Sequence, residues 1–246
     1  MNTPTIDLSH RGVPQNDWTT VVHGLPEFDA TLHQRLVVVA PHPDDETLGV
    51  GGLIAETSRR RVPVMIVSVS DGEAAPVPGS TPIELAIRRR DELRLASAHL
   101  CIAGAVDVQR WALPDGRLTE VEREITTRLR RLVQPGDLVV GTLPGDGHPD
   151  HEAVGRAVHA MVATPGVSVA FYPVWSWHWH DPARSSVAAN GRVVQLSAAA
   201  LRAKLDALQA YASQTTGDVP VLPAHFVQRF DRPYEVLVPA EIAIAA

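Results

Sequence analysis

The 246-residue chain has little cysteine, no broad basic charge and no long apolar run. Its one cysteine, Cys101, excludes an internal disulfide and favours a cytoplasmic location. As a small apolar residue, Cys101 is expected in the core. The net charge of −6 gives no basic field for nucleic acid. No apolar run approaches the length that crosses a bilayer, so we expect no membrane span.

Two further kinds of signal are missing. No internal repeat occurs at the period of a solenoid, and residues 1–11 lack the apolar centre of a secretory signal. Segment 49–52 is rich in glycine but lacks the G-x-G-x-x-G spacing, and acidic residues lie where a pyrophosphate would bind, which excludes a dinucleotide-binding loop. The apolar content of 45% is ordinary for a globular chain, and the length suits one α/β domain.

Apolar, β-branched runs alternate with helical segments along most of the chain. Strands are predicted over residues 36–40, 62–70, 106–111, 138–143 and 167–174, and helices over 47–60, 82–103, 118–133 and 151–162. This alternation predicts an α/β fold with a Rossmann-like, mostly parallel sheet and helices on both faces. Such sheets bind ligands at the C-terminal ends of their strands, so we expect the site there.

The chain is predicted to have two parts. Residues 1–34 form a polar N-terminal extension, packed on the domain or partly ordered, with Trp18 and Phe28 as anchors. Residues 35–246 form a single domain.

Two clusters of histidine and aspartate follow predicted strands. They are His42, Asp44 and Asp45 after residues 36–40, and Asp146, His148, Asp150 and His151 after residues 138–143. Zinc in hydrolases usually takes three ligands from His, Asp or Glu and leaves one position for water. His42 and Asp45 can turn toward one ion if the chain bends at Pro43. A third ligand from the second cluster would complete the site, and a remaining carboxylate would act as a base.

Each cluster alone is also typical of a turn or a helix cap, in which Asp44 or Asp45 caps the helix beginning near Glu46. Both clusters together, at two strand ends, favour a metal site. The spacing does not decide whether Asp44 or Asp45 is the ligand.

Residues 40–46 (Ala-Pro-His-Pro-Asp-Asp-Glu) and 148–151 (His-Pro-Asp-His) resemble the two signature motifs of the LmbE-like, or PIG-L, zinc-dependent N-acetylglucosaminyl deacetylases. Segments 70–73, 89–92 and 204–214 resemble further parts of that family. The likeness covers about residues 35–215.

This resemblance implies a role for each motif residue. The metal ligands would be His42, Asp45 and His151. The metal would be Zn²⁺, although Fe²⁺, Co²⁺ and Mn²⁺ also suit two histidines and one aspartate. Asp44 would be the general base, His148 would stabilise the oxyanion or protonate the amine, and Asp150 would orient His148.

The implied reaction is hydrolysis of the N-acetyl amide of an N-acetylglucosamine-type conjugate, which releases acetate and a free amino sugar. The implied partner is therefore a small-molecule amino-sugar conjugate, and a homo-oligomer is compatible with the family because some relatives assemble. Two alternatives stay open. A two-metal phosphoesterase would need a bridging carboxylate and more ligands. A non-catalytic carbohydrate-binding protein would need neither a base nor an acid.

Residues 175–180 hold three of the five tryptophans and two histidines. The segment is either core packing or a wall that binds a sugar or an acyl chain. If it is extended, Trp175, Trp177 and Trp179 share one face, and His178 and His180 share the other. The candidate substrate contacts are Trp177, His178, Trp179 and His180.

Arg89 lies in a basic run, residues 88–90, that is typical of a solvated helix face. The family resemblance favours an inward Arg89 that meets the substrate or an acidic group. Asp71 and Glu73 follow a predicted strand, so they either line the pocket or cap the next element.

Overall fold

The computed structural model describes residues 10–240, so most of the polar segment at residues 1–11 lies outside the described part. Seven strands form one sheet in the order β3-β2-β1-β4-β5-β7-β6. The strands are β1 (Arg35–Ala40), β2 (Val64–Ser68), β3 (Val106–Arg110), β4 (Asp137–Thr142), β5 (Ser168–Tyr172), β6 (Arg192–Gln195) and β7 (Tyr234–Pro239). The first five pair in parallel, while β7 is antiparallel to β5 and β6. The predicted α/β class is confirmed.

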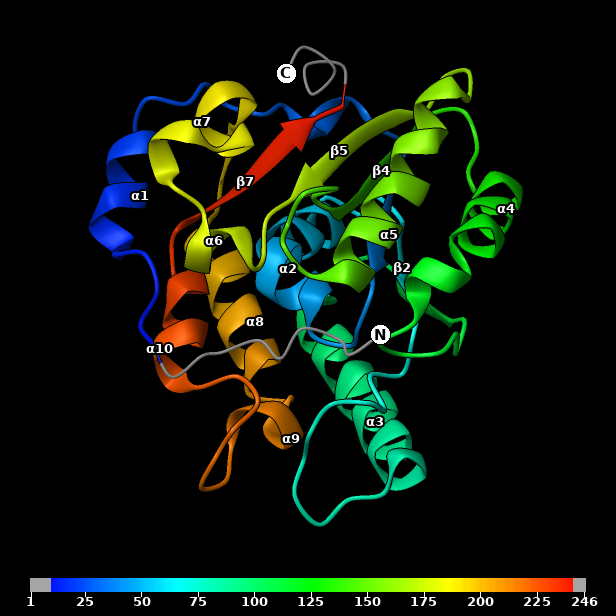
Figure 1. Ribbon diagram of the computed structural model, residues 1–246. Helices are drawn as coiled ribbons and strands as arrows, with labels where there is room; N and C mark the ends of the chain where they lie inside the picture. Colours follow the sequence, from blue (N-terminus) through cyan, green and yellow to red (C-terminus); the bar gives the residue numbers. More distant parts are fainter. Residues whose placement is uncertain (1–9, 241–246) are drawn as a thin grey trace.

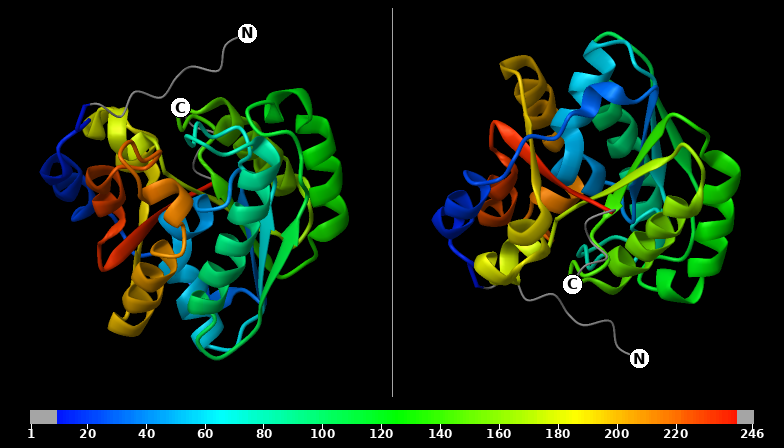
Figure 2. Two further views of the ribbon diagram at one scale, coloured as in Figure 1. Left: turned by 90° about the horizontal axis from the view of Figure 1, so that it is seen from below. Right: turned by 90° about the horizontal axis from the view of Figure 1, so that it is seen from above.

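Helices cover both faces of the sheet (Figures 1 and 2). The longer helices are α1 (Gln15–Val22), α2 (Asp45–Arg59), α3 (Pro82–Leu100), α4 (Glu122–Leu132), α5 (Pro149–His159) and α8 (Ala198–Leu208). The short ones are α6 (Ser176–Trp179), α7 (Ser186–Asn190), α9 (Ala212–Thr215) and α10 (Ala224–Val227). Helices α2, α3 and α8 pack together on one face, and α4 and α5 pack on the other.

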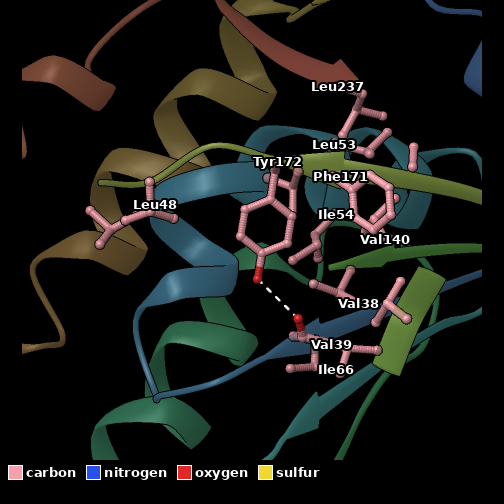
Figure 3. Close-up of a cluster of buried hydrophobic side chains, with 14 of the residues drawn as sticks. Val38, Val39, Leu48, Leu53, Ile54, Ile66, Val140, Phe171, Tyr172 and Leu237 are labelled. Carbon is pink, nitrogen blue, oxygen red and sulfur yellow. Dashed lines mark hydrogen bonds between the residues drawn. The ribbon is translucent and has the colours of Figure 1, made fainter. Parts of the chain in front are cut away.

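The core forms where the central strands meet α2. The side chains of β1 from Leu36 to Ala40 are buried, as expected for a parallel strand covered on both faces. Figure 3 shows Tyr172 of β5 reaching across this core, where its hydroxyl donates a hydrogen bond to the Val39 carbonyl at 3.1 Å. This contact joins the C-terminal ends of β5 and β1.

Strands β1 and β4 are neighbours, with Val39 opposite Gly141 in the register. Both strands run in the same direction, so the segments that follow them leave the sheet at the same edge. The two clusters of histidine and aspartate are therefore brought together, although about a hundred residues separate them in the sequence.

One sequence prediction is wrong, and the condition attached to another is not met. Cys101 is exposed, because it caps the C-terminus of α3 where the chain leaves the core, and its Sγ lies 3.1 Å from the Gly104 carbonyl. Residues 176–179 form the short helix α6 instead of an extended segment, so the alternation of tryptophan and histidine between two faces does not hold. Aromatic residues have strand propensity, but tertiary packing overrides it here.

Within the described residues 10–34, the chain packs against the rest of the protein. Trp18 is buried, and its Nε1 donates to the Trp177 carbonyl at 2.9 Å. Phe28 is half-buried, and its backbone N–H donates to the Val193 carbonyl at 2.8 Å. The boundary at residue 34 stays a prediction. Within residues 10–240, no helix has the length and apolarity that crossing a bilayer requires.

Candidate functional site

The turn between β1 and α2 separates two adjacent carboxylates. Asp44 has φ 135° and ψ −31°, a conformation that costs about 1–3 kcal/mol in a residue other than glycine. Its backbone N–H donates to Glu46 Oε2 at 3.1 Å, which helps to hold this conformation. The Asp44 carboxylate consequently meets Arg89, whereas the Asp45 carboxylate meets His42 and His151. The structure thus distinguishes two residues that spacing could not.

Three side chains converge at the strand ends. Asp45 Oδ2 lies 3.1 Å from His42 Nδ1 and 3.2 Å from His151 Nε2. One ligand atom from each of the three residues lies within 4.8 Å of the others, close enough for a single ion. His151 and Asp45 are buried, while the His42 side chain is 12% exposed. His42 therefore lies on the solvent side of the group.

The geometry of His151 fits a metal ligand. Its Nδ1 lies 2.8 Å from Asp146 Oδ2, and its Nε2 is buried without a hydrogen-bond partner among the described residues. A carboxylate that accepts from Nδ1 fixes the tautomer in which Nε2 carries a free lone pair. Two ligand atoms of a tetrahedral zinc ion are about 3.4 Å apart, near the spacing of Asp45 from both histidines. These residues thus suit a divalent ion.

The charges around these residues also favour a bound cation. Burial alone would lower the pKa of His151, but Asp45 and Asp146 raise it to about 9. Burial would raise the pKa of Asp45, but His151 and His42 hold it well below the usual range of a carboxyl group. The group is therefore built around negative charge, and a divalent cation would satisfy it in place of protons.

A second group of three potential ligands shares His42 and adds His148 and Asp150. The Asp150 carboxylate lies 3.3 Å from His42 Nε2, but it also accepts from the backbone N–H groups of Gly116 at 2.7 Å and Leu118 at 3.0 Å. These two bonds already orient the Asp150 carboxylate without a metal.

The expected contact between Asp150 and His148 takes a different form. The backbone N–H of Asp150 donates to His148 Nδ1 at 3.2 Å, and His148 is the N-cap of α5. Among the described residues, no hydrogen bond joins the Asp150 carboxylate to the His148 ring. Burial, with His151 and His42 nearby, lowers the pKa of His148 to about 3. His148 is therefore neutral near pH 7 and carries its proton on Nε2.

Arg89 faces inward and meets an acidic group. It is 3% exposed, whereas residues 88 and 90 on the same helix are exposed. Its guanidinium donates to Asp44 Oδ2 at 2.9 Å, to the Pro43 carbonyl at 2.6 Å and to the Gly72 carbonyl at 3.0 Å. Burial raises the pKa of Asp44 to about 8, although Arg89 acts to lower it. A cation bound beside Asp44 would act in the same direction as Arg89 and lower the pKa of Asp44.

Sequence reasoning missed Asp115, whose Oδ1 lies 3.0 Å from His42 Nε2. Glu73 accepts from the Asp115 backbone N–H at 3.1 Å, and Asp115 accepts from the Ala74 backbone N–H at 2.8 Å, so the two loops hold each other. Asp71 forms an ion pair with Arg110 at 2.6 Å. Asp115 follows a parallel strand by a few residues, and the strand-end rule that indicated His42 would also have indicated it.

Asp146 is an anchor for the loop after β5. Its carboxylate accepts from the backbone N–H groups of Val174, Trp175 and Ser176, and from the Ser176 hydroxyl, at 2.7–3.1 Å. It is fully buried. Because the same carboxylate contacts His151, it links the loop to the candidate metal ligands.

The aromatic segment, residues 175–180, lies partly at the candidate site and partly in the core. The Trp175 ring stacks on His148 with centroids 6.4 Å apart and on Trp179 at 5.3 Å. Trp177 points away and is 3% exposed, with its ring 4.7 Å from Trp18 and 4.2 Å from the Arg232 guanidinium.

The remaining candidates of this segment also differ in exposure. Trp179 and His180 are half-buried, and His178 is buried. Trp179 Nε1 donates to the Asp146 carbonyl at 3.1 Å. The structure brings Trp175 and Trp179 close to the second motif, while Trp177 packs against Trp18 in the buried layer.

Comparisons with known proteins agree with this geometry. The family model described as "PIG-L: GlcNAc-PI de-N-acetylase" matches residues 37–162. A Bacillus anthracis protein named "Probable N-acetyl-alpha-D-glucosaminyl L-malate deacetylase 2" is 31% identical over 206 residues, which are 78% of this chain and 87% of that protein. The diacetylchitobiose deacetylase of Thermococcus kodakarensis is 32% identical over 127 residues, which are 50% of this chain and 46% of that protein.

A solved structure shares the fold. The N,N'-diacetylchitobiose deacetylase of Pyrococcus horikoshii, in complex with an inhibitor, superposes with a TM-score of 0.60 and 23% sequence identity. The match covers 87% of this chain and 83% of that chain.

Proposed function

Because the chain belongs to the PIG-L family, we propose that it hydrolyses the N-acetyl amide of an N-acetylglucosamine-type conjugate, releasing acetate and a free amino sugar. The resemblance indicated by the two motifs is confirmed. The observation that carries the proposal is the group formed by His42, Asp45 and His151, in which the buried Nε2 of His151 makes no hydrogen bond among the described residues. Asp44, beside this group, supplies a base.

The proposed metal ligands are His42, Asp45 and His151, and Zn²⁺ is the proposed ion. When bound, a divalent ion supplies Lewis acidity toward the carbonyl and makes water more acidic. Fe²⁺, Co²⁺ and Mn²⁺ fit the same ligand set. Reconstitution of the metal-free protein with each ion would identify the most active form.

Asp44 is the proposed general base. Its carboxylate takes a proton from the attacking water as the oxygen bonds to the acetyl carbon, and Arg89 keeps the carboxylate in place. The Asp44 carboxyl group then holds that proton until the carbon–nitrogen bond breaks and the departing amine receives it. A single carboxyl group thus serves both proton transfers.

His148 is the proposed donor to the oxyanion. Its Nδ1 accepts a hydrogen bond, so the proton of the neutral ring lies on Nε2 and can be donated to the carbonyl oxygen as negative charge develops there. The low pKa of His148 argues against the alternative in which His148 protonates the amine. In this proposal, Asp150 holds the ring through its backbone N–H.

Substrate contacts are proposed for the half-buried Trp179, whose ring stacks on Trp175, and for the half-buried His180, which follows it in the chain. Trp177 and His178, also candidates from the sequence, are buried. We propose that they pack behind Trp179 and His180 and do not touch the substrate. A cytoplasmic location is part of the proposal, since a free, exposed Cys101 suits a reducing compartment.

An acetate-release screen tests the proposal. Metal-loaded protein would be assayed with N-acetylglucosamine linked to inositol, malate, lipid and antibiotic aglycones, and Asp44→Asn protein would be the matched control. Release of acetate by the wild type alone, from at least one conjugate, supports the proposal. If no conjugate yields acetate, and phosphate esters are hydrolysed by protein that binds two ions per chain, the phosphoesterase alternative replaces it.

A further inference from the structure

The outer face of α3 exposes three large apolar side chains among charged ones. Helix α3 spans 19 residues and begins with a capping box between Thr81 and Glu84. Its inner face, which includes Leu85, Leu93 and Leu100, is buried. On the outer side Ile83 is 75% exposed, Ile87 49% and Leu95 52%. Figure 1 shows α3 at the lower edge of the molecule, where a partner can reach it.

The centre of this face has the spacing of a coiled coil. Ile87, Asp91, Arg94 and Ala98 are separated by four, three and four residues, as successive core positions of a coiled coil are. All four are exposed, and a surface groove of about 510 Å³ is lined by Asp91, Arg94, Leu95 and Ala98. The stripe can therefore take the side chains of a second helix.

The same four positions are arranged symmetrically. Residues 87 and 98, like residues 91 and 94, lie at equal distances from the midpoint between residues 92 and 93. We propose that α3 packs antiparallel against α3 of a second copy of this chain, about a twofold axis at that midpoint. Ile87 then faces the partner's Ala98, and Asp91 faces the partner's Arg94, twice each in the dimer.

Charge selects the antiparallel direction. A parallel pair of helices would set Asp91 against the partner's Asp91, which is repulsive, whereas the antiparallel pair joins opposite charges. Arg94 makes no ion pair within residues 10–240, and Asp91 pairs only with the adjacent Arg90 at 3.2 Å, where both side chains are largely exposed. Both groups are thus free to engage a partner.

The apolar residues supply the affinity, and the charges fix the register. Exposed ion pairs contribute only about 0–1 kcal/mol each, so they cannot hold a dimer alone. Burial of Ile87 and of the flanking Ile83 and Ile102 adds apolar area at both ends of the contact. One helix pair makes a small interface, and we therefore expect a concentration-dependent dimer. This proposal does not rest on the reaction catalysed.

Cysteine cross-linking tests the register. In a Cys101→Ser background, the double variant Ile87→Cys, Ala98→Cys should form a disulfide-linked dimer under mild oxidation. Each single variant should stay unlinked, because equivalent residues of the two antiparallel helices are 11 positions, about 16 Å, apart. Equal cross-linking of a single variant, or none in the double variant, would overturn the proposal.

Sedimentation equilibrium tests the charge pairing without cross-links. Asp91→Arg and Arg94→Asp should each raise the dimer dissociation constant by at least about tenfold, because each sets like charges together. The double exchange should restore the wild-type value. Arg123→Asp, the same change on an exposed arginine of α4, is the control and should have no effect. A monomer at all concentrations, or a dimer indifferent to Asp91→Arg, would contradict the proposal.

Discussion

The carboxylate of Asp146 lies 2.8 Å from Nδ1 of His151 and accepts four further hydrogen bonds from the loop after β5. One buried side chain therefore sets both the tautomer of a candidate metal ligand and the path of the loop that carries Trp175. Asp146 therefore links the candidate metal ligands to the aromatic residues of that loop.

Asp146→Asn should weaken metal binding. An amide can still accept from the loop, but it cannot stabilise the donor tautomer of His151 as a carboxylate does, and such changes cost about 10–100-fold in metal affinity. Competition with a chelator, measured beside the wild type, checks this. Ser176→Ala, which removes one of the loop hydrogen bonds and leaves the contact with His151, is the control and should keep wild-type affinity.

Arg89→Met should lower kcat while the metal content stays full. The variant removes the donor to Asp44, so the carboxylate loses its orientation and its neighbouring positive charge. Arg89 acts to lower the pKa of Asp44, so its removal raises that pKa. Because the base must be ionised, the acidic limb of the kcat/KM profile should move to higher pH. An unshifted limb would show that another group is the base.

Glu235→Gln should destabilise the fold. The Glu235 carboxylate accepts from the backbone N–H groups of Gly52 and Leu53, at the kink of α2 where Val50 is not helical, and pairs with Lys204 at 2.7 Å. Removing one partner of a buried ion pair costs about 3–5 kcal/mol.

Urea unfolding measures this loss, and the double variant with Lys204→Met is its control. Because the double variant leaves no unpaired ammonium group in the core, it should be more stable than Glu235→Gln alone. If the two variants are equally unstable, the charge of Lys204 is not the cause.

Trp177 should matter for stability, and Trp179 should matter for substrate binding. Trp177→Ala should lower stability by about 3–5 kcal/mol with unchanged kinetics in the folded fraction, because its ring packs on Trp18 and Arg232. Trp179→Ala should raise KM or change the preferred aglycone with little loss of stability. Thermal melting and steady-state kinetics on the same preparations decide. The opposite assignment of the two effects would contradict this division.

The sequence predicted the parallel strands because β1 and β4 are short, buried and β-branched, and the metal group because both motifs follow such strands. It did not predict the antiparallel pair β6 and β7, whose residues mix polar and apolar side chains and pair only through tertiary context.

The details of the site that were missed depend on contacts distant in sequence. Asp115 reaches His42 through a loop held by Glu73, and Asp146, one of several candidate ligands in the sequence, anchors the loop after β5 instead. The unusual φ of Asp44, which separates two adjacent carboxylates, depends on Glu46 and Arg89. No local pattern reports such contacts.

The most direct test compares metal content and acetate release in Asp44→Asn and Asp45→Asn, two nearly isosteric changes at adjacent positions. Asp44→Asn should keep a full complement of one metal ion per chain and lose about 10²–10⁴-fold in kcat, the range for general-base catalysis. Asp45→Asn should lose the metal and the activity together. If Asp44→Asn keeps more than about a tenth of the wild-type kcat, or Asp45→Asn binds metal as the wild type does, the assignment of base and ligand is contradicted.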